Sequence, residues 1–191
     1  MSKRAAPSHP RRVLSPEYAL LGLLTLAPSH GYDLHQKLTT DLGNVWHVSQ
    51  SQAYSILKRL EERGDVSARA ERKGKLPRRQ VLHITTAGKK RFREWLDGAA
   101  SSGARTVRLE FLTRLYFANL IRPARVNRIY QAQEREIATA IRRLRLMLSQ
   151  VSEEQVYNRL SLDLRLRQME LVRSWLHDAR TKFHVKPEAE K

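Results

Sequence analysis

Residues 49–64 read SQSQAYSILKRLEERG, and this stretch decides the fold. Its apolar residues recur at spacings of three and four, which places them on one face of an α-helix. They are Ala53, Ile56, Leu57 and Leu60. Ser49 is a typical N-cap residue, and Gly64 is typical of a helix that ends in the left-handed conformation. The opposite face is polar and basic, so the stretch predicts an amphipathic helix with one face for a core and one for solvent or a ligand.

Two shorter helices are expected before this one. The first spans about residues 15–27, with Ser15 as its N-cap and Pro16 at its first helical position. The second spans about residues 32–42. Only the turn at 28–31, which contains proline and glycine, separates the two, so the three helices together predict a helix-turn-helix.

The pattern becomes alternating after Gly64, which predicts a β-hairpin. Its strands are expected at about 66–70 and 81–84, with a turn at 73–77. Residues 69–93 contain ten Lys and Arg against one acidic residue, a net charge of +9. This is the densest positive stretch of the chain, so the hairpin is predicted to have a basic tip.

Three helices followed by a hairpin make a winged helix-turn-helix, in which the third helix enters the DNA major groove and the hairpin reaches the backbone. The expected fold is therefore mainly α with a small β-hairpin wing. A fourth helix, capped by Thr85 or Thr86, closes this domain at about residue 98. The wing at 69–79 would bind phosphate by counterion release, and the third helix would read base edges. The predicted DNA-binding residues are Tyr32, Ser49, Gln50, Ser51, Gln52, Tyr54, Ser55, Lys58, Arg59, Lys73, Lys75, Arg78 and Arg79.

These assignments have structural alternatives. A polar helix face is often only solvated, and a basic hairpin can serve solubility. Tyr32 and Tyr54 can donate to phosphates, but they can equally cover the edge of a core.

The remainder of the chain is helical in pattern. Residues 98–103 are the predicted domain boundary, and a helical dimerisation and effector domain is expected at 105–183. Its long helix has core positions from Val126 to Val151 spaced 4, 3, 4, 3, 4, 3, 4, which is typical of a helix–helix seam. This seam favours a homodimer, with pairing inside the chain against the last helix as the alternative. The predicted dimerisation residues are Val126, Tyr130, Ile137, Leu144, Met147 and Val151.

Composition narrows the functional classes. The 191 residues carry a net charge of +17, which predicts an acidic partner, and their 41% apolar content is enough for a core. The absence of cysteine excludes disulfides and thiol nucleophiles and fits a reducing cytoplasm. No catalytic motif stands out and the histidines are scattered, so neither an enzyme nor a metal or cofactor site is expected. No span long enough for a bilayer and no export leader is expected.

Four segments carry a resemblance to the PadR family of transcriptional regulators. They are LLGLL at 20–24, HGYDL at 30–34, QAYSILKRLEERG at 52–64, and TTAG at 85–88 with the residues through Trp95. Their order and spacing resemble the family over about residues 15–98, and the helical remainder resembles its longer-tailed members. The resemblance implies a homodimer formed by the C-terminal helices, a palindromic DNA operator, repression, and release by a small aromatic effector that the sequence does not identify.

Two positions depart from the family pattern. Ser55 follows Tyr54 where a proline is usual, and Val81-Leu82 stands where an aromatic pair is usual. These changes affect individual base contacts and the packing of the wing.

Other hypotheses remain open from the sequence. Residues 1–100 carry +9 and residues 101–191 carry +8, so a non-specific basic protein of chromatin or RNA is the alternative. A membrane-surface protein is less favoured because the apolar faces are only as wide as a core requires. Residues 1–13 are predicted to be a basic arm that contacts either phosphate or nothing, and residues 184–191 are predicted to be a solvated tail.

Overall fold

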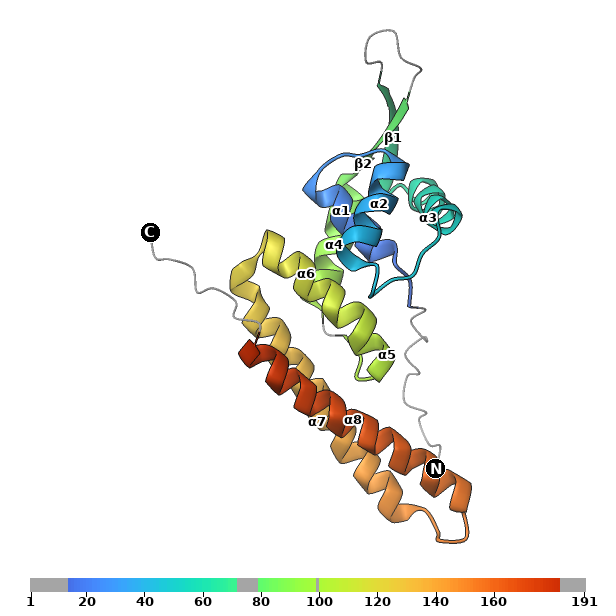
Figure 1. The fold of residues 1–191 in the computed structure, drawn as a ribbon, viewed down its shortest axis with the longest axis vertical. Coiled ribbons are helices and arrows are strands. Elements are labelled where there is room, and N and C mark those ends of the chain that lie inside the picture. Colours follow the sequence, from blue (N-terminus) through green and yellow to red (C-terminus); the bar gives the residue numbers. More distant parts are fainter. Residues whose placement is uncertain (1–13, 72–78, 99, 183–191) are drawn as a thin grey trace, which may run out of the picture.

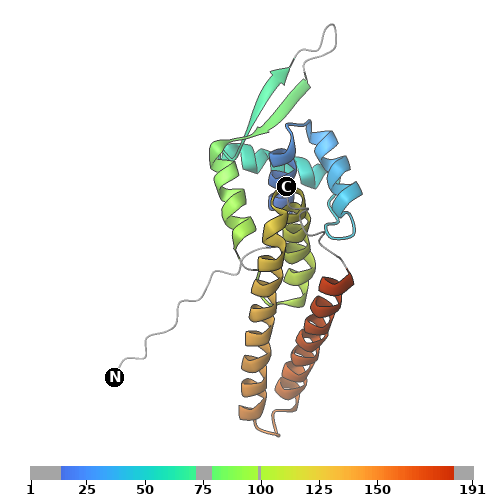
Figure 2. The ribbon, with the colours of Figure 1, turned by 90° about the vertical axis from the view of Figure 1, so that its left-hand side faces the viewer.

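The computed structural model describes residues 14–71, 79–98 and 100–182. Figures 1 and 2 show an elongated molecule with the β-hairpin at one end and two long helices at the other. Its elements, in chain order, are α1 (Glu17–Leu26), α2 (Gly31–Leu42), α3 (Gln50–Glu62), β1 (Val66–Glu71), β2 (Arg79–Ile84), α4 (Thr86–Asp97), α5 (Ala104–Thr106), the π-helix η1 (Val107–Phe111), α6 (Leu112–Ile121), the 3-10 helix η2 (Pro123–Arg125), α7 (Val126–Gln150) and α8 (Val156–Lys182). The expected mainly α fold with a hairpin wing is confirmed.

Helix α1 is the centre of the N-terminal domain. All residues from 19 to 24 are buried, because α2, α3, α4 and β2 surround this helix. The predicted N-cap is wrong by one residue: Pro16 is the N-cap, and the Ser15 hydroxyl only accepts a long bond of 3.4 Å from the Glu17 amide. Thr85, one of the two predicted caps, caps α4 by accepting from the Gly88 amide at 3.1 Å.

Strands β1 and β2 form an antiparallel pair whose register joins Val66 to Ile84 and Ala68 to Leu82. These four side chains pack against the core from one face of the hairpin. The turn before α2 also joins the sheet, since Ser29 and Leu82 exchange two backbone hydrogen bonds of 3.2 and 3.0 Å. The root of the wing is therefore fixed to the helix-turn-helix.

Helix α6 joins the two ends of the molecule. The Phe117 ring is fully buried and packs edge-on against Phe92 of α4. A Cβ atom at Gly22 of α1 would lie 2.4 Å from this ring, so α1 and α6 require glycine for their close approach. The Trp46 indole donates to the buried Thr113 hydroxyl at 2.8 Å. One core thus continues across residues 98–103, and the placement of a domain boundary there stays a prediction.

Helices α7 and α8 form a long antiparallel hairpin (Figure 2). The predicted seam on α7 is used within the chain: Val126, Tyr130, Ile137 and Leu144 are buried, whereas Met147 is 38% exposed. This is the intramolecular alternative that the sequence left open. A role of the seam between two chains stays a prediction.

Helix α8 has two opposite apolar faces. Its inner face packs on α7 through residues that include Leu162, Met169 and Leu176. A second row, spaced 3, 4 and 7 residues apart, points away from α7. It consists of Tyr157, Leu160, Leu164 and Leu171, which are between 58% and 87% exposed. We call this row the outer face of α8; nothing in the described chain covers it.

No helix within the described ranges is both long and apolar enough to cross a bilayer.

Candidate nucleic-acid interface

Helix α3 begins with a complete capping box. The Ser49 hydroxyl accepts from the Gln52 amide at 3.3 Å, and the Gln52 side-chain oxygen accepts from the Ser49 amide at 2.9 Å. Two predicted DNA-binding residues therefore also fix the start of the helix. The Nε2 donor of Gln52 is not part of this box.

The exposed face of α3 contains the other predicted residues of this helix. Gln50, Ser51, Tyr54, Ser55, Lys58 and Arg59 are all exposed, and the apolar face lies in the core. The Ser55 hydroxyl donates to the Ser51 carbonyl at 3.0 Å, and Lys58 forms a loose ion pair of 4.0 Å with Glu62. Figure 1 places α3 at the outer side of the domain, beside the root of the hairpin. The helix thus presents hydrogen-bonding groups in one row.

Tyr54 is held against the start of α2. A Cβ atom at Gly31 would lie 2.7 Å from the Tyr54 ring, so glycine permits this contact. Tyr32 is 49% exposed, and its hydroxyl accepts from Gln36 at 2.6 Å. Both tyrosines lie at the rim of a groove rather than inside the core, which favours the phosphate-donor hypothesis over the core-edge hypothesis.

This groove separates α3 from the wing. It has a volume of about 840 Å³, and we call it the wing-side groove. Its lining includes His30, Tyr32, Tyr54, Lys58 and Gln80. The His30 ring Nδ1 lies 2.9 Å from the Gln80 carbonyl, which ties the start of α2 to strand β2.

The structure does not test the predicted DNA-binding residues at the tip of the hairpin. Lys73, Lys75 and Arg78 lie outside the described residues, and Arg79 is described only by its backbone in β2. Their contacts with DNA stay a prediction.

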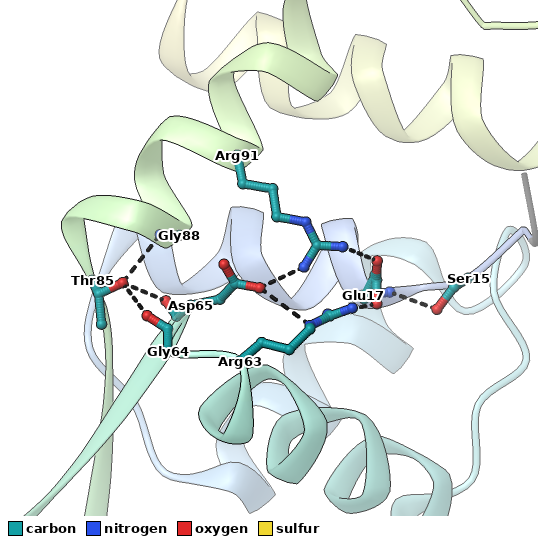
Figure 3. Close-up of polar contacts among 8 residues, drawn as sticks. All are labelled: Ser15, Glu17, Arg63, Gly64, Asp65, Thr85, Gly88 and Arg91. Atoms are coloured by element: carbon teal, nitrogen blue, oxygen red, sulfur yellow. Dashed lines mark hydrogen bonds and ion pairs between the residues drawn. The ribbon is translucent and has the colours of Figure 1, made fainter.

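An ionic cluster holds the end of α3 in place (Figure 3). Arg91 of α4 donates to Asp65 and, at 2.6 Å, to Glu17 of α1. Arg63, the C-cap of α3, donates to Glu17 at 2.9 Å and forms an ion pair with Asp65 at 3.4 Å. Burial lowers the pKa of Arg91, but Asp65 and Glu17 outweigh this effect and raise it above its ordinary value. The cluster thus joins α1, α3, β1 and α4 at one point.

A stack of side chains runs from this cluster toward the C-terminal helices. The Arg91 guanidinium lies 5.3 Å from the Tyr18 ring centroid, and Tyr18 stacks on Trp95 at 4.8 Å. Arg114 of α6 lies on Trp95, 4.8 Å from its centroid, and is 1% exposed. Arg114 also donates to Glu110 at 3.3 Å and to the Gly98 carbonyl. The position of α3 is therefore coupled by contact to the π-helix and α6.

Replacing Arg91 by glutamine is expected to destabilise the protein by about 1–3 kcal/mol, because the buried Asp65 loses its closest cationic partner. Urea unfolding followed by circular dichroism measures this. The matched control is Lys90→Gln, whose pair with Glu94 is exposed and 4.0 Å long, with an expected cost below about 0.5 kcal/mol. Equal costs for the two variants would contradict the structural role of the cluster.

The three tryptophans serve the core in different ways. Tyr18 and Arg114 cover the two faces of the Trp95 ring, and Trp46 is 8% exposed. Trp175 is 39% exposed and contacts Phe111 edge-on. Among the described residues, no group of three or more His, Asp or Glu side chains is placed to hold a metal ion.

Sequence reasoning missed the ionic cluster. Glu17, Arg63, Asp65 and Arg91 come from distant parts of the chain, and charges without a period carry no pairing signal.

Comparison with known proteins shows a similarity to one family over part of the chain. Residues 20–94 match the model of the transcriptional regulator PadR-like family. A curated relative, the negative transcriptional regulator PadR of Bacillus subtilis (strain 168), is 28% identical over 117 residues. This match spans 61% of the chain and 64% of the relative's length.

Two solved structures of B. subtilis PadR are similar. The complex with operator DNA is 24% identical, with a TM-score of 0.43, and the match covers 88% of this chain and 98% of that one. The complex with p-coumaric acid is 23% identical, with a TM-score of 0.41 and coverages of 87% and 97%. Residues 20–94 thus resemble the PadR-like family of transcriptional regulators, and the resemblance covers the helix-turn-helix, the hairpin and most of α4.

Proposed function

We propose that this protein is a sequence-specific, DNA-binding transcriptional repressor that acts as a homodimer. The observation that carries the proposal is the exposed polar row on α3, rigidly capped by Ser49 and Gln52 and fixed at its other end by the ionic cluster. An α-helix about 10–12 Å wide fits the major groove, which is about 12 Å wide. Gln side chains suit adenine, and Lys and Arg suit guanine.

The wing-side groove suits one DNA backbone strand beside α3. Tyr32 and Lys58 provide a hydroxyl and an ammonium at its edge, and the carboxylates of Asp33 and Glu61 also line it. The start of α2 provides backbone amides and a positive helix end, which attract phosphate. In this arrangement the bases face α3, and the phosphates face the residues that line the groove beside it.

The outer face of α8 supports the homodimer. Leu160, Leu164 and Leu171 expose apolar surface in a row, which is unusual unless a partner covers it. A second copy is the proposed partner, because tight binding by winged helices normally joins two of them on half-sites about 34–36 Å apart. Such a dimer would read a palindromic operator.

Repression and release are the finer parts of the proposal. The B. subtilis relative is a negative regulator, which supports repression here. Release requires a small molecule that binds one arrangement of the two recognition helices better than the other. The family resemblance implies that this molecule is aromatic. The stack from Arg91 to Arg114 gives such a molecule a physical connection to α3.

Selection from genomic DNA tests the proposal. Purified full-length protein is mixed with sheared genomic DNA at about 150 mM salt, where phosphate binding alone is weak, and the retained fragments are sequenced. We expect that a small number of fragments are enriched and that these fragments share an inverted repeat. Uniform retention of the genome would contradict the proposal and favour the non-specific basic protein.

A further inference from the structure

A second groove borders α3 on the side away from the wing. It has a volume of about 1140 Å³, and we call it the linker-side groove. One wall is α3, with Ser51, Ser55 and Arg59. The other wall is the first turn of the C-terminal helices, with Arg105 of α5 and Arg108 of η1.

The linker-side groove has an excess of unpaired positive charge. Arg63 and Lys58 in its lining are paired with Glu17 and Glu62, the two acids of the groove. Within residues 14–71, 79–98 and 100–182, no ion pair is found for the other three cations of the groove. These are Arg59, Arg105 and Arg108, and all three are exposed.

Arg105 and Arg108 are held at fixed positions. Arg105 comes from α5 and Arg108 from the start of η1, and both side chains line the same groove. The intervening Val107 and the following Leu109 are 3% and 5% exposed and pack into the core. This packing sets which way Arg105 and Arg108 point, and a rigid element presents a charge more accurately than a loop does.

We propose that Arg105 and Arg108 bind the phosphates of the DNA strand on the linker side of α3, and so extend the DNA interface into the C-terminal domain. The inference rests on the proposed function, because α3 must lie in the major groove. The two backbones that border the groove then run along the two sides of α3, one over the wing-side groove and one over the linker-side groove. Guanidinium groups are well suited to phosphate because they can donate two parallel hydrogen bonds.

The salt dependence of DNA binding tests this inference. The full-length protein and the variant R105Q/R108Q are titrated with a fluorescent duplex of random sequence between about 50 and 200 mM salt. Each lost phosphate contact reduces the slope of log K against log salt by about 0.9, so we expect a reduction of about 2 for each bound protomer. At about 150 mM salt the same relation predicts roughly 30-fold weaker binding per protomer.

Two further variants make the result specific. R142Q/R143Q removes the same charge from exposed positions on α7 and is expected to keep the wild-type slope. R105K/R108K keeps the charge and is expected to retain most of the slope. An equal reduction of the slope in R142Q/R143Q would overturn the inference. An unchanged slope in R105Q/R108Q would also overturn it, and this is the result expected if the groove binds a small free anion instead of DNA phosphates. Failure of the wild type to bind any duplex would instead contradict the proposed function itself.

Discussion

The double variant L160E/L164E is expected to be a monomer and to bind operator DNA at least about 100-fold more weakly than the wild type. Both leucines lie on the outer face of α8, where they are 59% and 58% exposed in the single chain, so glutamate is tolerated by the fold. In a dimer the same positions would be buried, and four carboxylates would be desolvated together. Loss of the second recognition helix removes the avidity of two linked sites, which contributes about 10²–10⁴ in affinity.

Light scattering measures the mass, and titration with the selected operator measures the affinity. The control Q131E/S149E also adds two negative charges, at exposed positions of α7, and is expected to leave the mass unchanged. A dimer that persists in L160E/L164E would show that the outer face of α8 is not the interface.

The α7 seam makes a contrasting case. Ile137 is fully buried against the rest of the chain, so a charge there is expected to unfold the helical hairpin rather than to separate two folded protomers. A loss of dimer in a variant of Ile137 would therefore not locate the interface.

Replacing Phe117 by alanine is expected to destabilise the protein by about 3–5 kcal/mol, the range measured for buried phenylalanine. The ring is fully buried and fills the space between Gly22 of α1 and Phe92 of α4. Because α1 and α4 cannot close over the cavity without moving the whole helix-turn-helix, the site cannot collapse. Urea unfolding followed by circular dichroism gives the free energy of unfolding.

Leu120→Ala provides the control on the same helix. Leu120 is 50% exposed, and its truncation is expected to change the free energy of unfolding by no more than about 0.5 kcal/mol. Similar values for Phe117→Ala and Leu120→Ala would contradict the picture of one core shared by the DNA-reading helices and the C-terminal helices.

Local signals in the sequence were sufficient for the helix-turn-helix. Helix α3 was expected over about 49–63 and is observed at Gln50–Glu62, because Ser49 and Gly64 mark its ends through contacts within a few residues. The hairpin was likewise predictable from a local signal, the alternating pattern of residues after Gly64. The exposed positions of Ser51, Ser55 and Lys58 followed from helical periodicity.

Features that depend on tertiary packing were not predictable. The pattern of α8 contains two apolar rows, and only the position of α7 decides that Leu162 is buried and Leu164 exposed. Arg105 and Arg108 are not singled out by the sequence, since nothing local indicates that they line the same groove as α3. The π-helix at Val107–Phe111 is an irregularity in a stretch that the sequence predicts only as helical in pattern.

Helix α3 is proposed to read a DNA sequence through its exposed polar row. The most direct measurement is the ratio of dissociation constants for the selected operator fragment and for a shuffled duplex of equal length and composition, at about 150 mM salt. We predict tighter binding to the operator by at least about two orders of magnitude, with two protomers per site. Equal dissociation constants for the two duplexes would contradict sequence-specific recognition by α3.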